Sequence, residues 1–405
     1  MRNPAAPGEA YRRAHVPVAV GPGRRESTVL VVGAAGYCGS IVVSNLLDAG
    51  YDVIAFDALL YGAHGIAPVA DRPGFELVVG DTRDSAELWP LLTRAGSVIH
   101  LGEIVGDPAC DLDPSVTEAI NLRATARLVS LAVNAGVSRF VYPSSCSVYG
   151  ATDHVVDEGD DPNPLSLYAR LKRDSEQSVL AHASATFHPT IFRIATAYGL
   201  SPRPRFDLVV NILAARAAAE GSIVVQGGGQ WRPFVHIADV AGLLAGTLER
   251  PAAAVSGQVF NLGSNTQNYT IAEVADIVQQ ELPAVRVLVS DSVDRRNYRV
   301  SFDRVGDVLG FTPTRTVAEG VAEIVRAVGN GHIADVRYPG YSNVRALVET
   351  SARLRLWRPE LGDGDPAAPF RPKDVLEALD ADAGDEAGAS ADERGGEGLT
   401  EAIGS

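Results

Sequence analysis

A doubly wound α/β fold, in which helices cover both faces of a parallel sheet, is predicted by three features of this 405-residue chain. Short apolar runs rich in β-branched residues recur through the first half, as is typical of strands buried on both faces. Helical stretches separate these runs, which is the alternation of a parallel sheet. A glycine-rich turn stands between the first run and the first helical stretch. Because the chain is longer than a usual single domain, we also expect a second, smaller α/β lobe.

The first run, TVLVV at residues 28–32, leads into the turn GAAGYCG at residues 33–39 and then into a helical stretch. Strand, glycine-rich turn and helix open a Rossmann unit, in which glycines let the backbone approach a pyrophosphate and the helix N-terminus favours its charge. A second strand, DVIAF at 52–56, ends at Asp57. That carboxylate suits a ribose diol and repels a 2′-phosphate. The sequence therefore predicts a Rossmann domain that binds NAD in preference to NADP.

Three more strands are expected within FELVVGDTRD at 75–84, SVIHLGE at 97–103 and RFVYPSSCSVYG at 139–150. The last of these ends in a hydroxyl cluster shortly before Tyr168 and Lys172, whose spacing of four places both side chains on one face of a helix. Arginine supplies 33 of the 35 basic residues, so lysine at this position is unusual for the chain. An ammonium beside a phenol favours the phenolate, and such a tyrosine can take a proton from a sugar or alcohol hydroxyl.

Taken together, these motifs resemble the extended short-chain dehydrogenases/reductases of the nucleotide-sugar epimerase/dehydratase family. The resemblance runs from about residue 28 to about residue 347 and includes, in the family's order, GAAGYCG, Asp57, GDTRD, HL at 100–101, SSCSVYG, YARLK, RIATAYG at 193–199 and WRPFVHIADV at 231–240. It implies a catalytic set of Ser145, Tyr168 and Lys172. Ser145 would hydrogen-bond the reacting hydroxyl, Tyr168 would deprotonate it, and NAD would take and later return the hydride.

The resemblance also implies which residues bind the two ligands. For the cofactor these are Gly33, Gly36, Tyr37, Cys38, Gly39, Asp57, Asp81, Thr82, Leu101 and Lys172. For the nucleotide-sugar substrate, held by the second lobe, they are Ser147, Asn211, Arg232 and one or both of Arg295 and Arg296. An arginine fork suits a diphosphate.

The reaction depends on two further positions. The Asp-Glu pair of the family's 4,6-dehydratases is replaced by Cys146 and Ser147, whereas Glu103 stands where the family more often has alanine. We expect Glu103 and Cys146 to face the sugar as acid and base of a 5,6-elimination. The alternatives are 4-epimerisation, with Glu103 turned to solvent and Cys146 a small core residue, a keto-sugar reductase or decarboxylating variant, and an NAD-sensing scaffold without turnover.

The remaining features concern organisation and location. We expect a flexible segment at 1–27, an NAD domain at 28–192, a mainly substrate-binding lobe at 193–350 with some return to the Rossmann sheet, and a disordered acidic tail at 359–405. The tail carries a net charge of −10 of the chain's −15, which leaves −5 for the rest and argues against nucleic-acid binding. Three cysteines, no apolar run long enough to span a membrane and no leader-like segment indicate a cytoplasmic protein without structural metal. We expect a homodimer.

Overall fold

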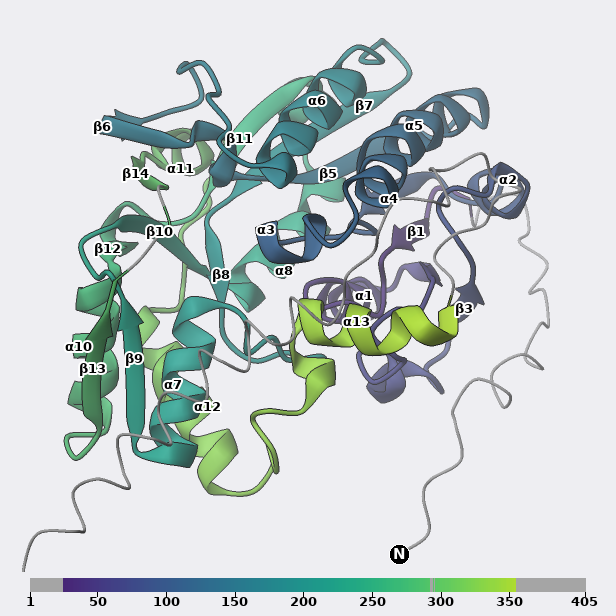
Figure 1. The fold of residues 1–405 in the computed structure, drawn as a ribbon. Coiled ribbons are helices and arrows are strands. Elements are labelled where there is room, and N and C mark those ends of the chain that lie inside the picture. Colours follow the sequence, from purple (N-terminus) through teal and green to yellow (C-terminus); the bar gives the residue numbers. More distant parts are fainter. Residues whose placement is uncertain (1–24, 292–293, 295, 355–405) are drawn as a thin grey trace, which may run out of the picture. The chain divides into compact units, whose positions relative to one another are not determined.

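The computed structural model describes residues 25–291, 294 and 296–354 of the chain (Figure 1). Arg295, most of the predicted N-terminal segment and the acidic tail lie outside the described residues. Within the described ranges, no helix combines the length and the apolar character needed to cross a membrane. The same ranges contain no cluster of three or more His, Cys, Asp or Glu side chains that could hold a metal ion.

A seven-stranded sheet, parallel throughout, forms the centre of the larger part of the molecule in the order β11-β7-β5-β4-β1-β2-β3. Its strands are β1 (Thr28–Val32), β2 (Asp52–Asp57), β3 (Phe75–Val79), β4 (Ser97–His100), β5 (Arg139–Ser145), β7 (His188–Ile194) and β11 (Gln258–Leu262). The strand order reverses beside β1, as in a doubly wound sheet, so the predicted fold class is confirmed. In such sheets ligands bind beyond the carboxyl ends of the strands at the reversal.

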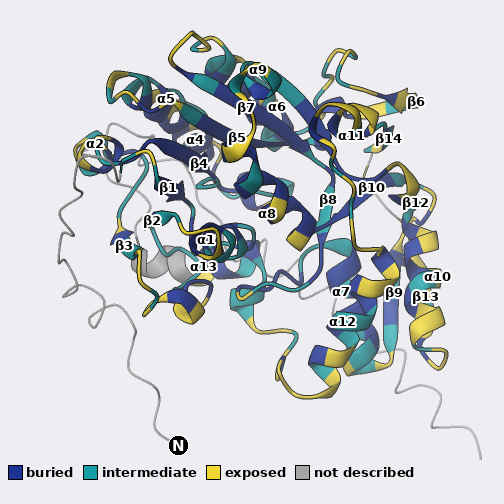
Figure 2. Cartoon of the chain, turned by 180° about the vertical axis from the view of Figure 1, so that it is seen from behind, coloured by how far each residue is buried: buried dark blue, intermediate teal, exposed yellow. Residues whose placement is uncertain are grey.

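The two faces of the sheet bury different residues of the same strand. Val29 and Val31 of β1 pack in one core with α1 (Gly39–Asp48) and α8 (Ile237–Gly246). Leu30 and Val32 pack in another, with α2 (Ser85–Leu92), α5 (Thr125–Asn134) and part of α6 (Leu167–Leu180). Figure 2 shows the central strands as buried along most of their length. Burial on both faces explains why the strands read as unbroken apolar runs rather than as alternating ones.

The second lobe has its own core. It contains the three-stranded sheet β12-β10-β8 and the pair β9–β13, against which α7, α10 and α12 pack. A capping box formed by Thr270 and Glu273 begins α10, and a second one, formed by Thr316 and Glu319, begins α12. The bounds are β8 (Thr196–Tyr198), β9 (Ser222–Gln226), β10 (Trp231–His236), β12 (Asn268–Thr270), β13 (Arg286–Ser290), α7 (Val209–Glu220), α10 (Ile271–Glu281) and α12 (Val317–Gly329).

Shorter elements complete the described fold. They are α3 (Asp107–Cys110), α4 (Pro114–Glu118), α9 (Ala252–Val255), α11 (Asp303–Leu309), and the paired strands β6 (Ala151–Val156) and β14 (Asn297–Val300). The last described helix, α13 (Asn343–Leu354), returns from the second lobe to contact α3 (Figure 1). This return places a segment from the end of the described chain beside the carboxyl ends of the first strands.

Candidate active site

The glycine-rich turn is held so tightly by its neighbours that two of its glycines admit no side chain. A Cβ on Gly33, where φ is +81°, would lie 2.5 Å from the backbone carbon of Leu101, and one on Gly39 would lie 2.1 Å from the carbonyl oxygen of Gly33. At Gly36 a Cβ would meet only that same oxygen, at 3.3 Å. Gly33 and Gly39 therefore bring strand, turn and helix together, and Gly36 leaves the backbone open to the pocket.

Asp57 ends β2 beside this turn and fastens it. Its carboxylate accepts hydrogen bonds from the backbone N–H of Ala35 at 2.9 Å and of Leu59 at 2.7 Å. Burial raises the pKa of Asp57, although these two hydrogen bonds act in the opposite direction. All ten predicted cofactor residues border one pocket at the carboxyl ends of the strands. Glycine turn, carboxylate and pocket together fit a dinucleotide such as NAD.

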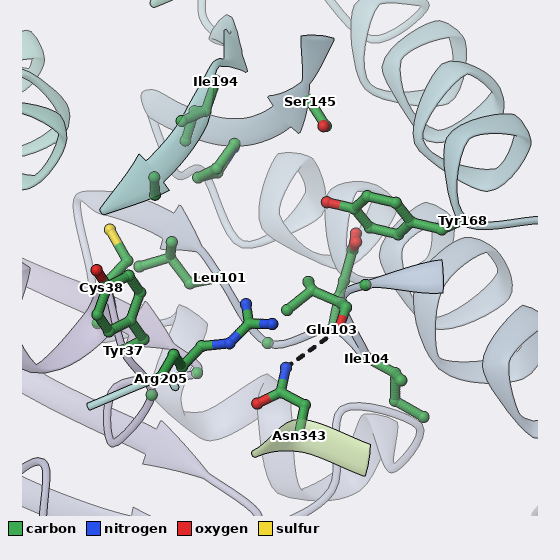
Figure 3. Close-up of a pocket in the computed structure, with 18 of the residues that line it drawn as sticks. Tyr37, Cys38, Leu101, Glu103, Ile104, Ser145, Tyr168, Ile194, Arg205 and Asn343 are labelled. Atoms are coloured by element: carbon green, nitrogen blue, oxygen red, sulfur yellow. Dashed lines mark hydrogen bonds between the residues drawn. The ribbon is translucent and has the colours of Figure 1, made fainter. Parts of the chain in front are cut away.

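The predicted catalytic residues border the same pocket from its other side. Ser145 ends β5, and Tyr168 and Lys172 lie on one face of α6, which Ser166 caps by accepting a hydrogen bond from Ala169 N at 3.2 Å. In Figure 3, the Ser145 and Tyr168 hydroxyls point into the same space. The Ser145 oxygen accepts a hydrogen bond from Ser147 N at 3.1 Å, which leaves its own O–H to donate.

Glu103 belongs to a buried network behind this space and does not turn to solvent, since its side chain is 1% exposed. One carboxylate oxygen lies 2.7 Å from Lys172 Nζ. The other accepts hydrogen bonds from Tyr142 Oη at 2.7 Å and from Thr125 Oγ1 at 3.3 Å. Lys172 also donates to the carbonyl of Pro143 at 2.6 Å. Glu103 thus borders the pocket, but its carboxylate is engaged with Lys172.

This pairing reverses one expectation about Tyr168. The sequence predicts that Lys172 lowers the pKa of Tyr168, yet burial, together with the negative charge of Glu103, raises that pKa. The Lys172 ammonium lies 5.9 Å from the centre of the Tyr168 ring, with its charge compensated by Glu103. In the protein alone, Tyr168 is therefore a protonated phenol at neutral pH, and a further positive charge is needed to favour its phenolate.

Cys146 is directed away from the sugar side of the pocket, contrary to the expectation that it faces the substrate. It is 1% exposed within the hydrophobic core, and its thiol donates to the carbonyl of Arg193 at 3.1 Å. Burial raises the pKa of the Cys146 thiol. Ser145 and Ser147 on either side of it border the pocket, but Cys146 does not. A buried, protonated thiol bonded to the backbone is not placed to act as an acid or base on a sugar.

The predicted substrate residues divide into two groups. Ser147 and Arg296 border the pocket; the buried Ser147 hydroxyl has no hydrogen-bond partner among the described residues, and Arg296 pairs with Asp107 at 2.7 Å. Asn211 and Arg232 are not among the residues that border it, and their contacts with the sugar and diphosphate stay predictions.

The polar atoms of Asn211 and Arg232 bond to other groups of the protein. The Asn211 amide accepts from Gly199 N at 2.8 Å and donates to the carbonyl of Arg205 at 3.0 Å. The Arg232 guanidinium pairs with Asp294 at 2.8 Å and donates to the carbonyl of Trp231 at 2.7 Å. These side chains organise the walls behind the pocket instead of its surface.

Several residues that the sequence reasoning missed also border the pocket, namely Tyr61, Asp107, Arg203, Arg205 and Asn343. Two of them, Arg203 and Arg205, lie in SPRPR, a Pro-Arg alternation directly after the RIATAYG motif, and this was an available signal. No local sequence signal identified Asn343, because it reaches the pocket only where α13 packs back against the Rossmann part (Figure 3).

Comparisons with known proteins agree with this site. The model of the NAD dependent epimerase/dehydratase family matches residues 29–263. A dTDP-glucose 4,6-dehydratase from an Actinoplanes species is 27% identical over 73% of this chain and 96% of its own. A UDP-glucose 4-epimerase from Mycolicibacterium smegmatis is 29% identical over 74% of this chain and 98% of its own. The solved structure of MoeE5 with UDP-glucuronic acid and NAD is 30% identical, has a TM-score of 0.64, and covers 75% of this chain and 99% of its own.

The chain therefore belongs to the NAD dependent epimerase/dehydratase family and is an enzyme that uses NAD. The resemblance expected from the sequence motifs is confirmed. Because the relatives include both dehydratases and epimerases, membership of the family leaves the choice between these reactions open.

Proposed function

We propose that this enzyme is a nucleotide-sugar 4-epimerase whose substrate is a UDP-linked hexose or hexuronic acid. The observation that carries the proposal is the position of Cys146. Since its thiol points into the core, the expected acid–base pair of an elimination is incomplete. Tyr168 and Ser145 remain at the pocket, and an epimerisation needs one proton carrier. MoeE5, which binds UDP-glucose and UDP-glucuronic acid in its solved structures, supports the substrate class.

In this mechanism the Ser145 hydroxyl orients the sugar hydroxyl, and the Tyr168 phenolate removes its proton. When bound, NAD supplies a hydride acceptor and a positive charge, which favours the phenolate against the negative charge of Glu103. The oxidised sugar rotates within the pocket so that the other face of its C4 carbonyl receives the returning hydride. Tyr168 then gives the proton back to the carbonyl oxygen. Lys172 keeps its ammonium beside Tyr168 because Glu103 and the Pro143 carbonyl hold it there.

A 5,6-elimination is the second candidate, and one observation favours it. Glu103 places a carboxylate behind Tyr168 at a position where the family more often has alanine, and its charge acts on the phenol. For an elimination, Glu103 has to leave its contacts with Lys172 and Tyr142 and take a proton from the sugar. The epimerase reading requires no such rearrangement.

The experiment is to incubate purified holoenzyme with UDP-glucose and UDP-glucuronic acid, with dTDP-glucose as a comparison, and to identify products by mass and NMR. Unchanged mass with an inverted coupling pattern at C4 supports epimerisation. Loss of one water supports elimination, and loss of carbon dioxide from UDP-glucuronic acid indicates a decarboxylating variant. Absence of turnover on any nucleotide sugar, with NAD still bound, favours the scaffold alternative.

We propose further that the enzyme works as a homodimer in the cytoplasm. The described cysteines, Cys38, Cys110 and Cys146, are all free thiols, in keeping with a reducing compartment. Sedimentation of the holoenzyme at the mass of a single chain would contradict the dimer.

A further inference from the structure

A loop of the second lobe reaches the cofactor side of the pocket. This loop joins β8 to α7, and its first residue, Gly199, accepts a hydrogen bond from Tyr37 Oη of the glycine turn at 2.6 Å. Further along the same loop, Arg203 borders the pocket with only 3% of its surface exposed. The guanidinium carbon of Arg203 lies 4.2 Å from the centre of the Tyr61 ring, which follows β2 and Asp57. The loop therefore brings a cation to the nucleotide-binding half of the site.

Only part of the Arg203 guanidinium is hydrogen-bonded to the described residues. Its Nη1 donates to Asn343 Oδ1 at 2.7 Å. Its Nε and Nη2, which form the two-donor edge of the guanidinium, have no hydrogen-bond partner within the described part of the chain. The neighbouring Tyr61 hydroxyl is buried and likewise without a partner there. Arg203 and Tyr61 both border the pocket, and three buried donors without acceptors are costly for a protein to maintain unless a ligand completes them.

Other arginines of this chain show what that edge usually binds. Nε and Nη2 of Arg83 hold both oxygens of Asp81, at 3.0 and 2.7 Å. The same atoms of Arg205 hold Asp207, at 2.9 and 3.0 Å. Arg203 lacks such a carboxylate. Burial lowers the pKa of Arg203 to about 10, which still leaves it charged at neutral pH. A planar, charged two-donor edge matches a carboxylate or a phosphate.

We propose that Arg203, with Tyr61, binds the pyrophosphate of NAD from the side opposite the glycine turn. The Tyr37–Gly199 hydrogen bond ties the Arg203 loop to the turn, whose backbone is the expected pyrophosphate site. Asp57, the residue expected to bind the adenosine ribose, is near enough for its charge to act on Arg203. Arg203 closes over the cofactor, which the glycine turn alone would leave open on one side.

Asn343 makes this contact depend on the C-terminal part of the fold. Its side-chain oxygen accepts the hydrogen bond from Arg203. Its backbone N–H donates to Asp207 at 2.9 Å, and its side-chain amide N–H donates to the carbonyl of Val105 at 3.1 Å. Asn343 begins α13, so this helix fastens the Arg203 loop against the strand ends of the Rossmann sheet. Asn343 is a positioning residue: its Oδ1 holds Nη1 of Arg203 and so sets the direction of the Nε–Nη2 edge.

The test compares nucleotide binding by full-length Arg203→Gln with that of the wild type, using calorimetric titration with NAD, NADP, ADP and adenosine. ADP carries the two phosphates and adenosine carries none. We expect Arg203→Gln to raise Kd for NAD and ADP by about 10- to 100-fold, the range of a charge-assisted contact, and to leave adenosine within about twofold. The matched control is Arg337→Gln, which removes an exposed arginine paired with Glu220 and should change none of these constants.

Three outcomes overturn the proposal. An unchanged Kd for ADP means that Arg203 does not touch the phosphates. An equal loss for ADP and adenosine means that Arg203 only shapes the pocket. A selective loss of NADP binding, with NAD unaffected, assigns Arg203 to a 2′-phosphate instead. If Arg203→Gln does not fold, Tyr61→Phe removes one donor alone and should weaken ADP a few-fold while leaving adenosine unchanged. None of these readouts depends on the sugar chemistry.

Discussion

Glu103→Gln separates the two candidate reactions, because it removes a charge and keeps the side-chain shape. In the wild type the Glu103 carboxylate lies 2.7 Å from Lys172 Nζ, and both side chains are almost completely buried. Removing one partner of a buried pair costs about 3–5 kcal/mol, because the other charge stays buried without compensation. The glutamine oxygen still accepts from Tyr142, so we expect a loss in the free energy of unfolding near the lower end of that range. Urea denaturation of the NAD-saturated enzyme measures it.

The same variant should change the pH dependence of catalysis. Tyr168 acts as a base, so kcat/KM rises with pH through its pKa, and the Glu103 charge raises that pKa. Without this charge, the rising limb of the kcat/KM profile should move to lower pH. Turnover at the pH optimum should stay within about tenfold of wild type if the enzyme is an epimerase. If Glu103 is the base of an elimination, product formation should fall by about 10²–10⁴-fold while bound NAD is still reduced.

Tyr142→Phe is the matched control, since it removes one hydrogen bond to Glu103 and leaves the Glu103–Lys172 pair in place. It should move the rising limb far less than Glu103→Gln does. If the rising limb of the kcat/KM profile lies at the same pH in Glu103→Gln as in the wild type, the Glu103 charge does not act on the Tyr168 phenol. A loss of stability below about 1 kcal/mol would refute the cost assigned to the unpaired lysine.

Three further predictions concern single residues. Tyr168→Phe should abolish turnover while retaining NAD, because only the ionisable oxygen is lost; a wild-type rate by product assay would exclude Tyr168 as the base. NAD should bind about 100-fold more tightly than NADP, because the Asp57 carboxylate repels a 2′-phosphate, and Asp57→Asn should narrow this gap in direct titrations; equal wild-type affinities would count against this placement. Cys146→Ala should keep kcat within about tenfold, since the thiol is a core group; a stalled variant with reduced NAD would return the thiol to the mechanism.

Local sequence patterns were sufficient for the parts of the site that are contiguous in the chain. The run TVLVV becomes β1 with the predicted bounds, and the glycines that follow it form the turn that Asp57 fastens. Tyr168 and Lys172 face the pocket together, because their spacing and the α6 helix determine this directly. These features depend on strand and helix periodicity, which a single sequence contains.

Contacts between distant segments could not be predicted in the same way. Glu103 follows β4 and Lys172 lies on α6, so their ion pair depends on how the two elements pack. Asn211 and Arg232 occupy family motifs, but their polar atoms bond the surrounding backbone and Asp294 instead of facing the pocket. Cys146 begins a 3-10 turn, Cys146–Tyr149, directly after β5, so the period-two alternation of a strand does not determine where its side chain points.

The most direct test of the central claim is the fate of a deuterium at C4 of the substrate. Holoenzyme is incubated in ordinary water with UDP-glucose and with UDP-glucuronic acid, each deuterated at C4, and the products are analysed by mass and NMR. We predict a 4-epimer of unchanged mass that retains the deuterium at C4, with no net consumption of NAD, because the hydride leaves and returns within one pocket. A product lighter by one water, or an epimer that has exchanged its deuterium for solvent hydrogen, would contradict it.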